Sequence, residues 1–458
     1  MFPANRRPRM VTIAHALDRV KDELGKYLPA PAIVEACMKV GHRWRKRKFD
    51  PVTTIHLFVL QVLCFNTAIT HLRHLAGMAI NGAAYCKARM RLPLTVLQHL
   101  LEHSAAAMAR AAGHVHHCAQ WCGLRVYLVD ASSTIAPDTP DVRRKFPQPT
   151  GQKPGCGLPV PKLVGLFDAC SGLIVRVLFF SLYTHDLRGA IRLHPLLGAG
   201  DLLVGDRAFC SYAHLGLLWM RQVAGLFRMH QRREVDFRRR GSRPGKLGGV
   251  RWRRIRRLGR RDHVVEWSKP ADHHRPAWMS QHAYAELPPT LLVRELRYSI
   301  VRRGQRTRQV TIATTLLDPL LYPREKIAEL YGLRWRAETH FAELKTVLKM
   351  RRVKCQTAEG VQKEMAVYCL VYNLVHMIML EAARRQKVPA DRISFLDTVR
   401  WLLSAAPGEQ LPNLIVNPRR EGRHEPRVMK DLQDTHMKMT VPRRQMKRNP
   451  ARWGGRPK

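Results

Sequence analysis

The sequence contains few acidic residues, few aromatic residues and no long run of apolar residues. Against 79 Lys and Arg there are only 35 Asp and Glu, and aromatic residues make up 7% of the 458 positions. The longest apolar stretch, near residues 53–65, is too short and too polar to span a bilayer, and the start of the chain has no apolar signal-peptide core. The ten cysteines show no paired spacing. These absences predict a cytoplasmic protein with reduced thiols and no membrane segment.

Two kinds of site are also missing or incomplete. The sequence has no G-x-x-x-x-G-K-[ST] loop and no G-x-G-x-x-G fingerprint, which predicts that no nucleotide cofactor is bound. Histidines and cysteines gather at residues 114–122, but no second ligand pair follows at the spacing of a zinc finger. A zinc site is therefore not favoured there.

The excess of positive charge is the strongest feature of the composition. The formal charge is +44, while 45% of the residues are hydrophobic, which is enough to bury a core in two or three domains. Such a protein attracts polyanions in a salt-sensitive way, and nucleic acid is the natural partner. Net charge alone leaves open a ribosomal protein, a membrane-surface protein or the bias of an Arg-rich genome.

Two aspartates end apolar strands. Asp130 ends the run LRVYLVD, and Asp206 ends LLVGD. The strands KLVGLFD and LIVRVLFF follow the first aspartate as a hairpin, and helices at about 186–197 and 211–223 then alternate with strands, the last being GLFRMH. The order β-β-β-α-β-α-β predicts an α/β fold with a mixed sheet, as in the ribonuclease-H-like fold. Its first and fourth strands lie side by side and bring the two aspartates together, although either one alone is more typical of a turn or a helix cap.

A third acidic residue stands on a predicted helix, YGLRWRAETHFAELKTVLKM. At about 100° per residue, one narrow polar stripe is formed by Tyr331, Arg334, Glu338 and Lys345. A buried stripe lies beside it, and the opposite face, which includes His340 and Glu343, is expected in solvent. One carboxylate held beside two cations and a phenol suits a metal ion and a DNA phosphate. The alternative is an ordinary solvated face laced with ion pairs.

These motifs resemble those of bacterial insertion-sequence DDE transposases, in the insertion-sequence-4 class marked by a Y-(2)-R-(3)-E-(6)-K signature. The four residues of the polar stripe match that signature at every spacing. The runs YLVDASST and VGDRAFCSY resemble the motifs around the first and second aspartates of that class. The likeness extends from roughly residue 80 to 440.

The resemblance implies a DNA transposase that binds the terminal inverted repeats of an insertion sequence and carries out cut-and-paste strand cleavage and strand transfer. The implied catalytic residues and metal ligands are Asp130, Asp206 and Glu338. The implied DNA-binding residues are Tyr331, Arg334 and Lys345. The expected cofactor is a pair of Mg²⁺ ions, for which Mn²⁺ can substitute, because Mg²⁺ prefers hard oxygen ligands and two ions suit phosphodiester exchange. The expected partners are transposon-end DNA and target DNA, with a homodimer in the synaptic complex, in a nucleoid-associated bacterial protein.

The chain divides into five predicted segments. They are a helical N-terminal DNA-binding region (1–115), a first part of the catalytic core (116–230), a basic, mostly β insertion (231–315), a second part of the core (316–395) and a basic C-terminal tail (396–458). Within the first segment, TAITHLRHLAGMAINGAAYCKARMRLP predicts two short helices about a turn. They form either a helix-turn-helix, with Lys87, Arg89 and Arg91 facing a major groove, or a plain helical hairpin.

The insertion is inferred from the 338 − 206 = 132 residues between Asp206 and Glu338, which is more than a compact core needs. Its basic stretch at 238–262 is expected to contact the DNA backbone, with a disordered linker as the alternative. In the resembling family, an aromatic side chain of such an insertion can hold a flipped base. Trp252 and Trp267 are the candidates here, but a core or surface role is more usual for each.

Two other functions stay open. A structure-selective nuclease on the same fold would share the metal site and cut without joining. A DNA-binding protein derived from a transposase would have lost its chemistry, although the intact acidic trio argues against this. The residues Tyr331, Arg334 and Lys345 favour the transposase, because a simple hydrolase does not need to retain the cleaved end.

Overall fold

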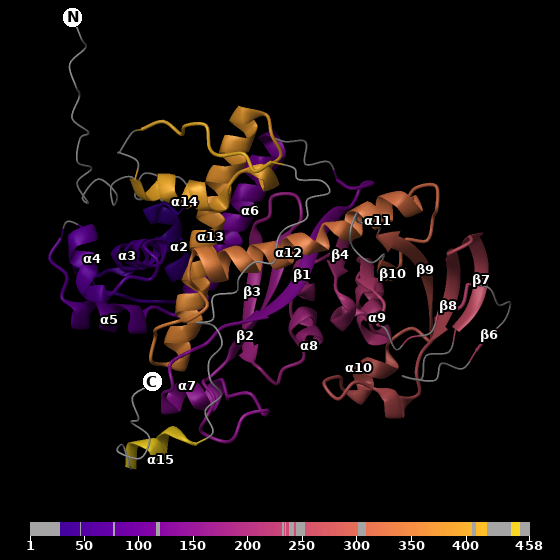
Figure 1. The fold of residues 1–458 in the computed structure, drawn as a ribbon, viewed down its shortest axis with the longest axis horizontal. Coiled ribbons are helices and arrows are strands. Elements are labelled where there is room, and N and C mark those ends of the chain that lie inside the picture. Colours follow the sequence, from indigo (N-terminus) through magenta and orange to yellow (C-terminus); the bar gives the residue numbers. More distant parts are fainter. Residues whose placement is uncertain are drawn as a thin grey trace, which may run out of the picture. The chain divides into compact units, whose positions relative to one another are not determined.

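The structure is a computed structural model that describes residues 28–418 and 441–448, apart from 46, 77, 116–119, 231–232, 234, 238–241, 244–251, 301–307 and 405–408. The chain forms two compact units, which are drawn in Figure 1. The helical unit takes residues up to 117 together with 173–175 and 342–419. The α/β unit takes residues 118–172, 176–341 and those from 420 onward. Each unit is therefore assembled from segments that lie far apart in the sequence.

The helical unit combines N-terminal and C-terminal helices. Its elements are α2 (Ala30–Lys39), α3 (Pro51–Leu63), α4 (Ile69–Leu75), α5 (Gly82–Arg91), α6 (Leu94–Val115), a π-helical segment η4 (Glu343–Val347), α13 (Ala358–Gln386), a 3-10 turn η5 (Ala390–Arg392) and α14 (Phe395–Ser404). Local capping explains where several of them begin. Asp50 accepts a hydrogen bond of 2.7 Å from the backbone of Thr53 and is followed by proline at the first position of α3, and Asn81 caps α5 in the same way.

Helix α13 is the core of the helical unit. Every side chain from Val361 to Leu380 is buried, and the helix packs against α3, α6 and α14. By length and composition it would suit a membrane span, but 94% of its most apolar window is buried inside the protein. We therefore assign it as a core helix, and the prediction that the longest apolar stretch lies near residues 53–65 is wrong.

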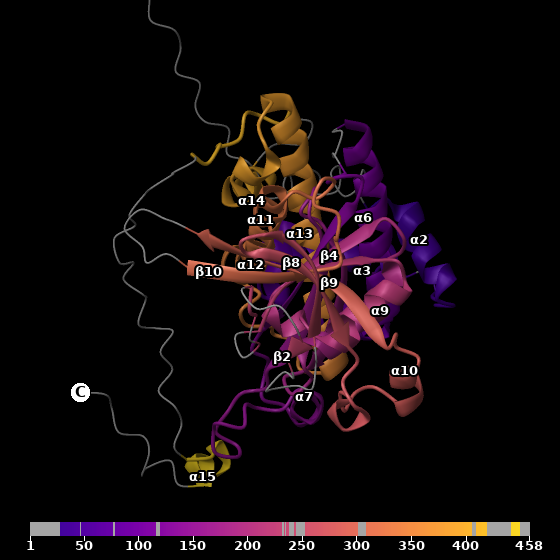
Figure 2. The ribbon, with the colours of Figure 1, turned by 90° about the vertical axis from the view of Figure 1, so that its right-hand side faces the viewer.

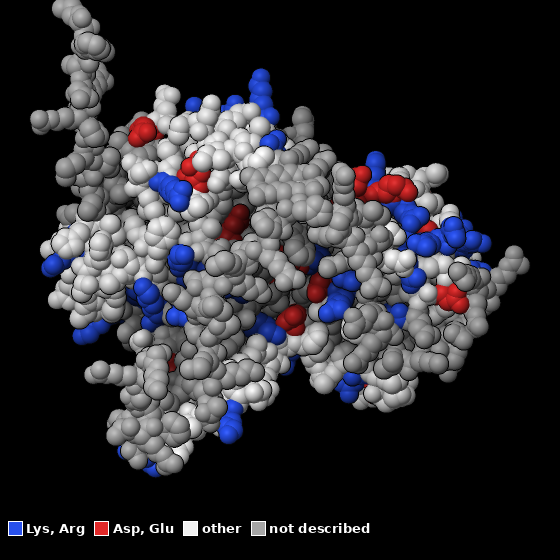
Figure 3. Space-filling model, in the orientation of Figure 1, with Lys and Arg blue, Asp and Glu red and all other residues white. Residues whose placement is uncertain are grey.

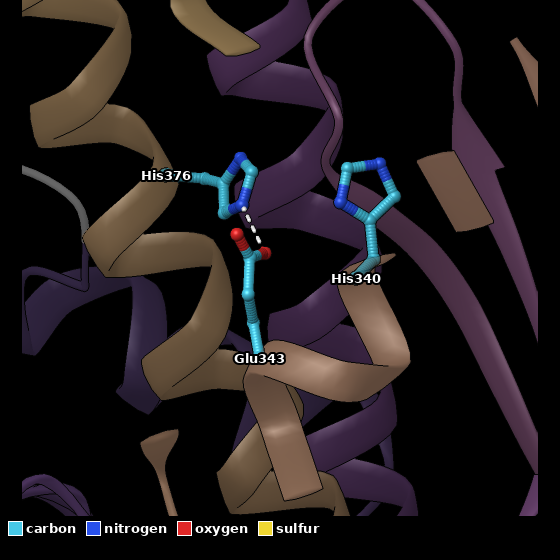
Figure 4. Close-up of side chains that lie close together, drawn as sticks. All are labelled: His340, Glu343 and His376. Carbon is cyan, nitrogen blue, oxygen red and sulfur yellow. Dashed lines mark hydrogen bonds and ion pairs between the residues drawn. The ribbon is translucent and has the colours of Figure 1, made fainter. Parts of the chain in front are cut away.

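A half-buried carboxylate, that of Glu343, connects η4 to α13 within the helical unit. Figure 4 shows Glu343 and His376, whose Oε2 and Nε2 atoms lie 3.4 Å apart. The Tyr372 hydroxyl also hydrogen-bonds to Glu343, and burial, followed by the charge of Glu343, raises the pKa of Tyr372 well above its usual value. His340, also drawn in Figure 4, belongs to the α/β unit.

The two short helices predicted about a turn are α4 and α5. Lys87 and Arg91 are exposed on α5, whereas the guanidinium of Arg89 donates to Gln61 and Cys355 and lies 3.7 Å from the ring centre of Phe58. The prediction that Arg89 faces a DNA groove is wrong, because packing within the helical unit engages this guanidinium on several sides.

A sheet runs through the α/β unit. Within the described residues it has ten strands in the order β3-β2-β1-β4-β5-β10-β9-β8-β7-β6. Their bounds are β1 (Arg125–Ser133), β2 (Pro161–Asp168), β3 (Ile174–Ser181), β4 (Asp201–Gly205), β5 (Ala224–Arg228), β6 (Ser242–Arg243), β7 (Trp252–Gly259), β8 (Asp262–Ser268), β9 (Thr290–Ile300) and β10 (Arg308–Thr314). Strand β1 is antiparallel to β2 and parallel to β4, which is parallel to β5. The order β3-β2-β1-β4-β5 confirms the predicted ribonuclease-H-like fold and the pairing of the first and fourth strands.

Helices cover both faces of this sheet. The helices of the α/β unit are α7 (Pro140–Lys145), α8 (Asp186–Ile191), α9 (Tyr212–Met220), α10 (Gln281–Ala285), α11 (Arg324–Gly332), α12 (Arg334–Ala342) and α15 (Arg443–Arg448), with 3-10 turns η1 (His194–Leu196), η2 (Arg207–Phe209) and η3 (Asp272–His274). On β2, Val164 lies against Gly189 of α8, whereas Gly165 lies against Phe341 of α12. Adjacent residues of a strand point to opposite faces, so α8 and α12 cover opposite sides of the sheet. Figure 2 shows α9 and α10 to one side of the strands, with α11 and α12 to the other.

The strands of the inserted segment extend the same sheet. β10 pairs antiparallel with β5, and β9, β8, β7 and β6 follow outward. Trp267 is fully buried and Trp252 is 7% exposed, which confirms the core positions considered for them. Part of the stretch 238–262 forms β7 and β8, while the turn at 301–307 lies outside the described residues.

Most of the cysteines are free thiols. Eight are free in the structure, but Cys170 is disulfide-bonded. The prediction of reduced thiols is therefore wrong for Cys170. The histidine and cysteine cluster at 114–122 lies mostly outside the described residues, and so does the basic tail from 419 to 440.

Candidate active site

Two aspartates lie side by side on neighbouring parallel strands. Asp206 directly follows β4, whereas β1 continues past Asp130 to Ser133, so the prediction that Asp130 ends its strand is wrong. Val129 of β1 pairs with Gly205 of β4, so Asp130 and Asp206 are the next residues on each strand and stand side by side. Asp206 keeps an extended backbone (φ −79°, ψ −173°), so its side chain continues the pattern of the strand. The expected meeting of the two carboxylates is borne out by this register.

Glycine is required just before the second aspartate. A Cβ atom at Gly205 would lie 2.9 Å from Phe209 and 3.0 Å from Val129. The adjacent strands and the turn after β4 therefore pack closely at this point. This close packing fixes the backbone that carries Asp206.

Backbone amides orient both carboxylates. Asp130 Oδ1 accepts a hydrogen bond of 2.9 Å from the amide of Ala131, and Asp206 Oδ1 accepts one of 2.8 Å from the amide of Ala208. The second bond caps the 3-10 turn η2. Among the described residues, the other carboxylate oxygen of each aspartate makes no hydrogen bond, which leaves lone pairs for a ligand.

Glu338 is supplied by α12, which crosses β2 on one face of the sheet. Phe167 of β2 packs edge-on against Phe341 and stacks on His340, with ring centres 5.2 and 5.3 Å apart. One helical turn before Phe341, Glu338 accepts a hydrogen bond of 2.7 Å from Arg334 Nη1. The Arg334 side chain is 15% exposed and that of Glu338 is 38% exposed.

The pKa of Asp130 responds to the charges of the other acidic residues. Burial raises the pKa of Asp130 to about 6, while the hydrogen bond from Ala131 lowers it. The charge of Asp206 raises this pKa, that of Arg334 lowers it and that of Glu338 raises it. The charges of Asp206, Arg334 and Glu338 therefore all act on Asp130.

Tyr331 joins the same cluster at the end of α11. It is 7% exposed, and its hydroxyl has no hydrogen-bond partner among the described residues. Burial raises the pKa of Tyr331, and the charges of Arg334 and Arg228 lower it. The guanidinium of Arg334 also lies 5.9 Å from the centre of the Tyr331 ring. Burial lowers the pKa of Arg334, but Tyr331, Glu338 and Asp130 together raise it above its usual value.

Sequence reasoning missed two residues of this cluster, Arg228 and Tyr298. Phe227 of β5 pairs with Gly205 of β4, so Arg228 stands level with Asp206 at the end of the next parallel strand. Burial raises the pKa of Tyr298 on β9 to about 12, and the charges of Arg228 and Arg334 lower it. Arg228 was detectable, because it follows the apolar run GLF just as each aspartate follows its own apolar run. Tyr298 had no such signal, since it comes from a strand far along the chain.

The helix predicted over residues 331–350 is interrupted. It consists of α11 and α12, separated at Leu333, followed by the π-helical segment η4. Of the predicted signature, the α/β unit brings together Tyr331, Arg334 and Glu338, whereas Lys345 lies in η4 and belongs to the helical unit. The expectation that His340 and Glu343 face solvent is wrong, because His340 is 7% exposed and Glu343 is bound to His376.

Comparison with known proteins decides the family. A profile described as the transposase DDE domain matches residues 121–374, which is more than half of the chain. The chain belongs to this DDE transposase family. A relative among characterised proteins is the transposase InsG for insertion sequence element IS4 of Escherichia coli (strain K12). It is 26% identical over 368 residues, and the match covers 76% of each chain.

A similarity also exists among solved structures. The piggyBac transposase synaptic complex with hairpin DNA matches with a TM-score of 0.42 and 10% identity over 86% of this chain and 81% of that one. The family to which this transposase belongs catalyses DNA cleavage and strand transfer and uses divalent metal ions. The donor set fits such ions, because it offers hard carboxylate oxygens from Asp130, Asp206 and Glu338 and no sulfur.

Proposed function

We propose that this transposase binds the terminal inverted repeats of an insertion sequence and catalyses cut-and-paste cleavage and strand transfer, with Asp130, Asp206 and Glu338 as the catalytic residues. The observation that carries this assignment is the register of β1 and β4, which sets the two aspartates side by side beneath the helix bearing Glu338. The cofactor is a pair of Mg²⁺ ions, for which Mn²⁺ substitutes.

The carboxylates are arranged to hold cations. Bound ions supply a nucleophile at neutral pH and stabilise the oxygens of the attacked phosphate. Asp130 is oriented by one amide and Asp206 by another, so neither has to reorganise to present its free oxygen. The raised pKa of Asp130 expresses the cost of ionising a buried acid beside two others, a cost that a cation offsets.

The remaining signature residues hold the DNA. Arg334 offers a guanidinium at the edge of the acidic cluster, and Tyr331 offers a buried hydroxyl with no partner among the described residues. Phosphate oxygens accept hydrogen bonds from both kinds of group. Lys345 is assigned to the same task through the signature spacing alone.

Three basic segments extend the DNA contact. They are the N-terminal region (1–115), the insertion (231–315) and the tail (396–458). Figure 3 shows Lys and Arg side chains gathered beside α11 and over the nearby ends of the insertion strands, and Arg253, Arg256 and Arg257 are exposed on β7. The partners are transposon ends and target DNA, joined by a homodimer in the synaptic complex. No nucleotide cofactor is needed, and the protein acts in the bacterial cytoplasm at the nucleoid.

The test is a cleavage and joining assay with labelled end DNA and Mg²⁺. Asp130→Asn, Asp206→Asn and Glu338→Gln should each lower the rate by about 100-fold or more, since each removes a charge needed in the transition state. DNA binding should persist in all three. The matched control is Glu329→Gln, which removes an exposed carboxylate from α11 and should leave the rate unchanged.

The same assay separates the transposase from a nuclease. Wild-type protein that cuts the ends without joining them would favour the structure-selective nuclease. Wild-type protein that binds the ends without cutting in either metal would favour the catalytically silent DNA-binding protein. Full activity in one of the three variants would remove that residue from the catalytic set.

A further inference from the structure

A pocket of about 370 Å³ lies in the helical unit, between the loop at 41–50 and the end of α5. This volume falls within the range of small-ligand sites, about 300–1,000 Å³. The pocket belongs to a unit of the protein that contains neither Asp130 nor Asp206. The active site does not account for it.

The loop that forms the pocket is fixed at both of its ends. Helix α2 closes with Gly41 in the left-handed region (φ 68°), where the amide of Gly41 donates to Met38 and the amide of His42 donates to Cys37, both at 2.9 Å. This pair of bonds is a Schellman motif, which sets the direction in which the chain leaves the helix. At the other end, Asp50 caps α3. The pocket is therefore built by two well-defined helix ends.

Four arginines line the pocket. They are Arg43, Arg45, Arg47 and Arg91, and all four are exposed. In the part of the chain that the structure describes, no carboxylate forms an ion pair with any of them. Four like charges around one hollow repel each other, so an anion that enters gains from all of them.

Aromatic rings line the same hollow. The rings of His42 and Trp44 are nearly parallel, at 21° with centres 5.9 Å apart, and Trp44 is 36% exposed. Phe49 also lines the pocket and packs at 5.9 Å against the buried ring of Tyr85. Phe49 is thus held by the core, while Trp44 lines the pocket and stays partly exposed.

We propose that this pocket holds one unpaired nucleotide of the bound DNA strand. Arginines around an exposed indole match a ligand that carries a phosphate and a flat ring together, since phosphate binds guanidinium and a base stacks on an aromatic face. A paired base inside a duplex has no free face, so the nucleotide must be unpaired. This inference rests on the proposed function, because it takes DNA as the substrate.

The experiment measures binding of the full-length protein to end-sequence duplexes in EDTA, where cleavage does not occur. One duplex carries a single-nucleotide bulge with 2-aminopurine, and the other is fully paired. The bulged duplex should bind more tightly, and its 2-aminopurine fluorescence should be quenched. Trp44→Ala should weaken binding of the bulged duplex by about 5-fold to 100-fold, as expected for loss of one base–ring stack, and should leave the paired duplex nearly unchanged.

Two matched controls define the outcome. Trp219→Ala removes a tryptophan that is 56% exposed on α9, and Arg400→Gln removes an exposed guanidinium on α14. Neither control should change the preference for the bulged duplex. The double variant Arg45→Gln with Arg47→Gln should abolish this preference. Trp44→Phe, which keeps an aromatic ring, should retain most of it. Equal effects of Trp44→Ala and Trp219→Ala, or unquenched fluorescence, would overturn the proposal.

A free nucleotide also carries a phosphate and a base, so it is the alternative ligand for this pocket. A deoxynucleoside monophosphate that displaced the bulged duplex at micromolar concentration would assign the pocket to free nucleotides and contradict the strand-binding proposal. Because binding in EDTA is independent of catalysis, failure of the pocket is distinguishable from failure of the proposed function. A loss of Mg²⁺-dependent cleavage with an intact bulge preference would count only against the proposed function.

Discussion

Arg334 links the acidic cluster to the DNA-binding residues. It donates to Glu338 at 2.7 Å, and its guanidinium lies within 6 Å of the rings of Tyr331 and Trp335. One cation therefore neutralises a proposed metal ligand and faces the path proposed for the DNA. These two roles have opposite consequences for metal affinity and DNA affinity, which makes them separable.

Arg334→Gln should weaken binding of the DNA end but lower the Mg²⁺ concentration needed for half-maximal cleavage. Removing the cation leaves Glu338 more negative and a better ligand, and an ion pair with this exposure is worth about 1 kcal/mol or less, so the shift should be at most several-fold. Titration of Mg²⁺ at saturating DNA measures it. Arg336→Gln, two residues away on α12, is the control. A higher Mg²⁺ requirement in Arg334→Gln would contradict the neutralising role.

His194 and His214 form a buried, hydrogen-bonded pair whose surroundings determine their protonation state. His214 Nδ1 lies 2.6 Å from the carbonyl oxygen of Phe209, which can only accept, so Nδ1 carries the proton. Neutral His214 then has a bare Nε2, which accepts from His194 Nε2 at 3.0 Å. Burial lowers the pKa of His214 to about 4 and that of His194 to about 2. Both rings are neutral in the folded protein at neutral pH.

Stability should therefore fall as the pH drops below about 6.5, the ordinary histidine value. The unfolded chain binds protons there that the folded rings do not bind. The contribution to stability is therefore complete above pH 6.5 and is lost progressively toward pH 4 for His214 and toward pH 2 for His194. Urea unfolding between pH 7 and 5 measures the slope. His194→Gln keeps a donor for His214 and removes one titrating group, so its slope should be shallower. His282→Gln, on the surface, should not alter it, and an unchanged slope in both variants would refute the argument.

At the scale of elements, one side chain of helix α13, that of Asn373, hydrogen-bonds to the first residue of strand β3. Asn373 is fully buried, accepts from the amide of Ile174 at 2.8 Å and donates to the carbonyl of Ile174 at 2.9 Å. Gln386, near the end of the same helix, makes the same pair of bonds with Leu414 but is only half-buried. The two residues differ mainly in their access to water.

Asn373→Leu should lower the free energy of unfolding by about 2–4 kcal/mol, because it leaves two buried backbone groups without partners. Gln386→Leu should cost about 1 kcal/mol or less, since Gln386 is only half-buried and water can take the place of its side-chain amide. Urea denaturation of both variants under the same conditions provides the comparison. Equal losses would mean that burial of these hydrogen bonds does not set their contribution.

Elements with strong local signals were predictable from the sequence. The apolar runs that end in Asp130 and Asp206 are clear strand signals, so the pairing of these strands and the sheet order followed from connectivity. The 331–350 helix was misjudged because a break at Leu333 and the π-helical turn after Ala342 depend on tertiary packing. The prediction assumed a constant rotation of about 100° per residue, which such interruptions change. The predicted polar stripe therefore extends only as far as Glu338.

At the scale of the whole molecule, the sequence did not reveal that α13 packs with the N-terminal helices. Glu364 on α13 is 1% exposed and accepts from Asn66 and from the amide of Lys354. Contacts between residues nearly 300 positions apart leave no local pattern. The predicted boundaries at 115, 230, 315 and 395 stay predictions.

The net charge of +44 belongs to the molecule as a whole, but its effect on DNA should depend on where it is placed. Arg256 and Arg257 are exposed on β7, near the outer end of the sheet, and Arg384 and Lys387 are exposed at the end of α13. Removing either pair changes the net charge by the same amount. Counterion release depends instead on how many phosphates the protein contacts.

Arg256→Gln with Arg257→Gln should therefore flatten the plot of log affinity against log salt by about 1.8, or about 0.9 for each lost phosphate contact. Arg384→Gln with Lys387→Gln should leave the slope nearly unchanged. Binding of end-sequence duplex at several salt concentrations measures both slopes, and neither variant should alter cleavage at saturating DNA. If both pairs flattened the plot equally, long-range charge rather than contact with β7 would govern binding, and the DNA path proposed over the insertion would have to be abandoned.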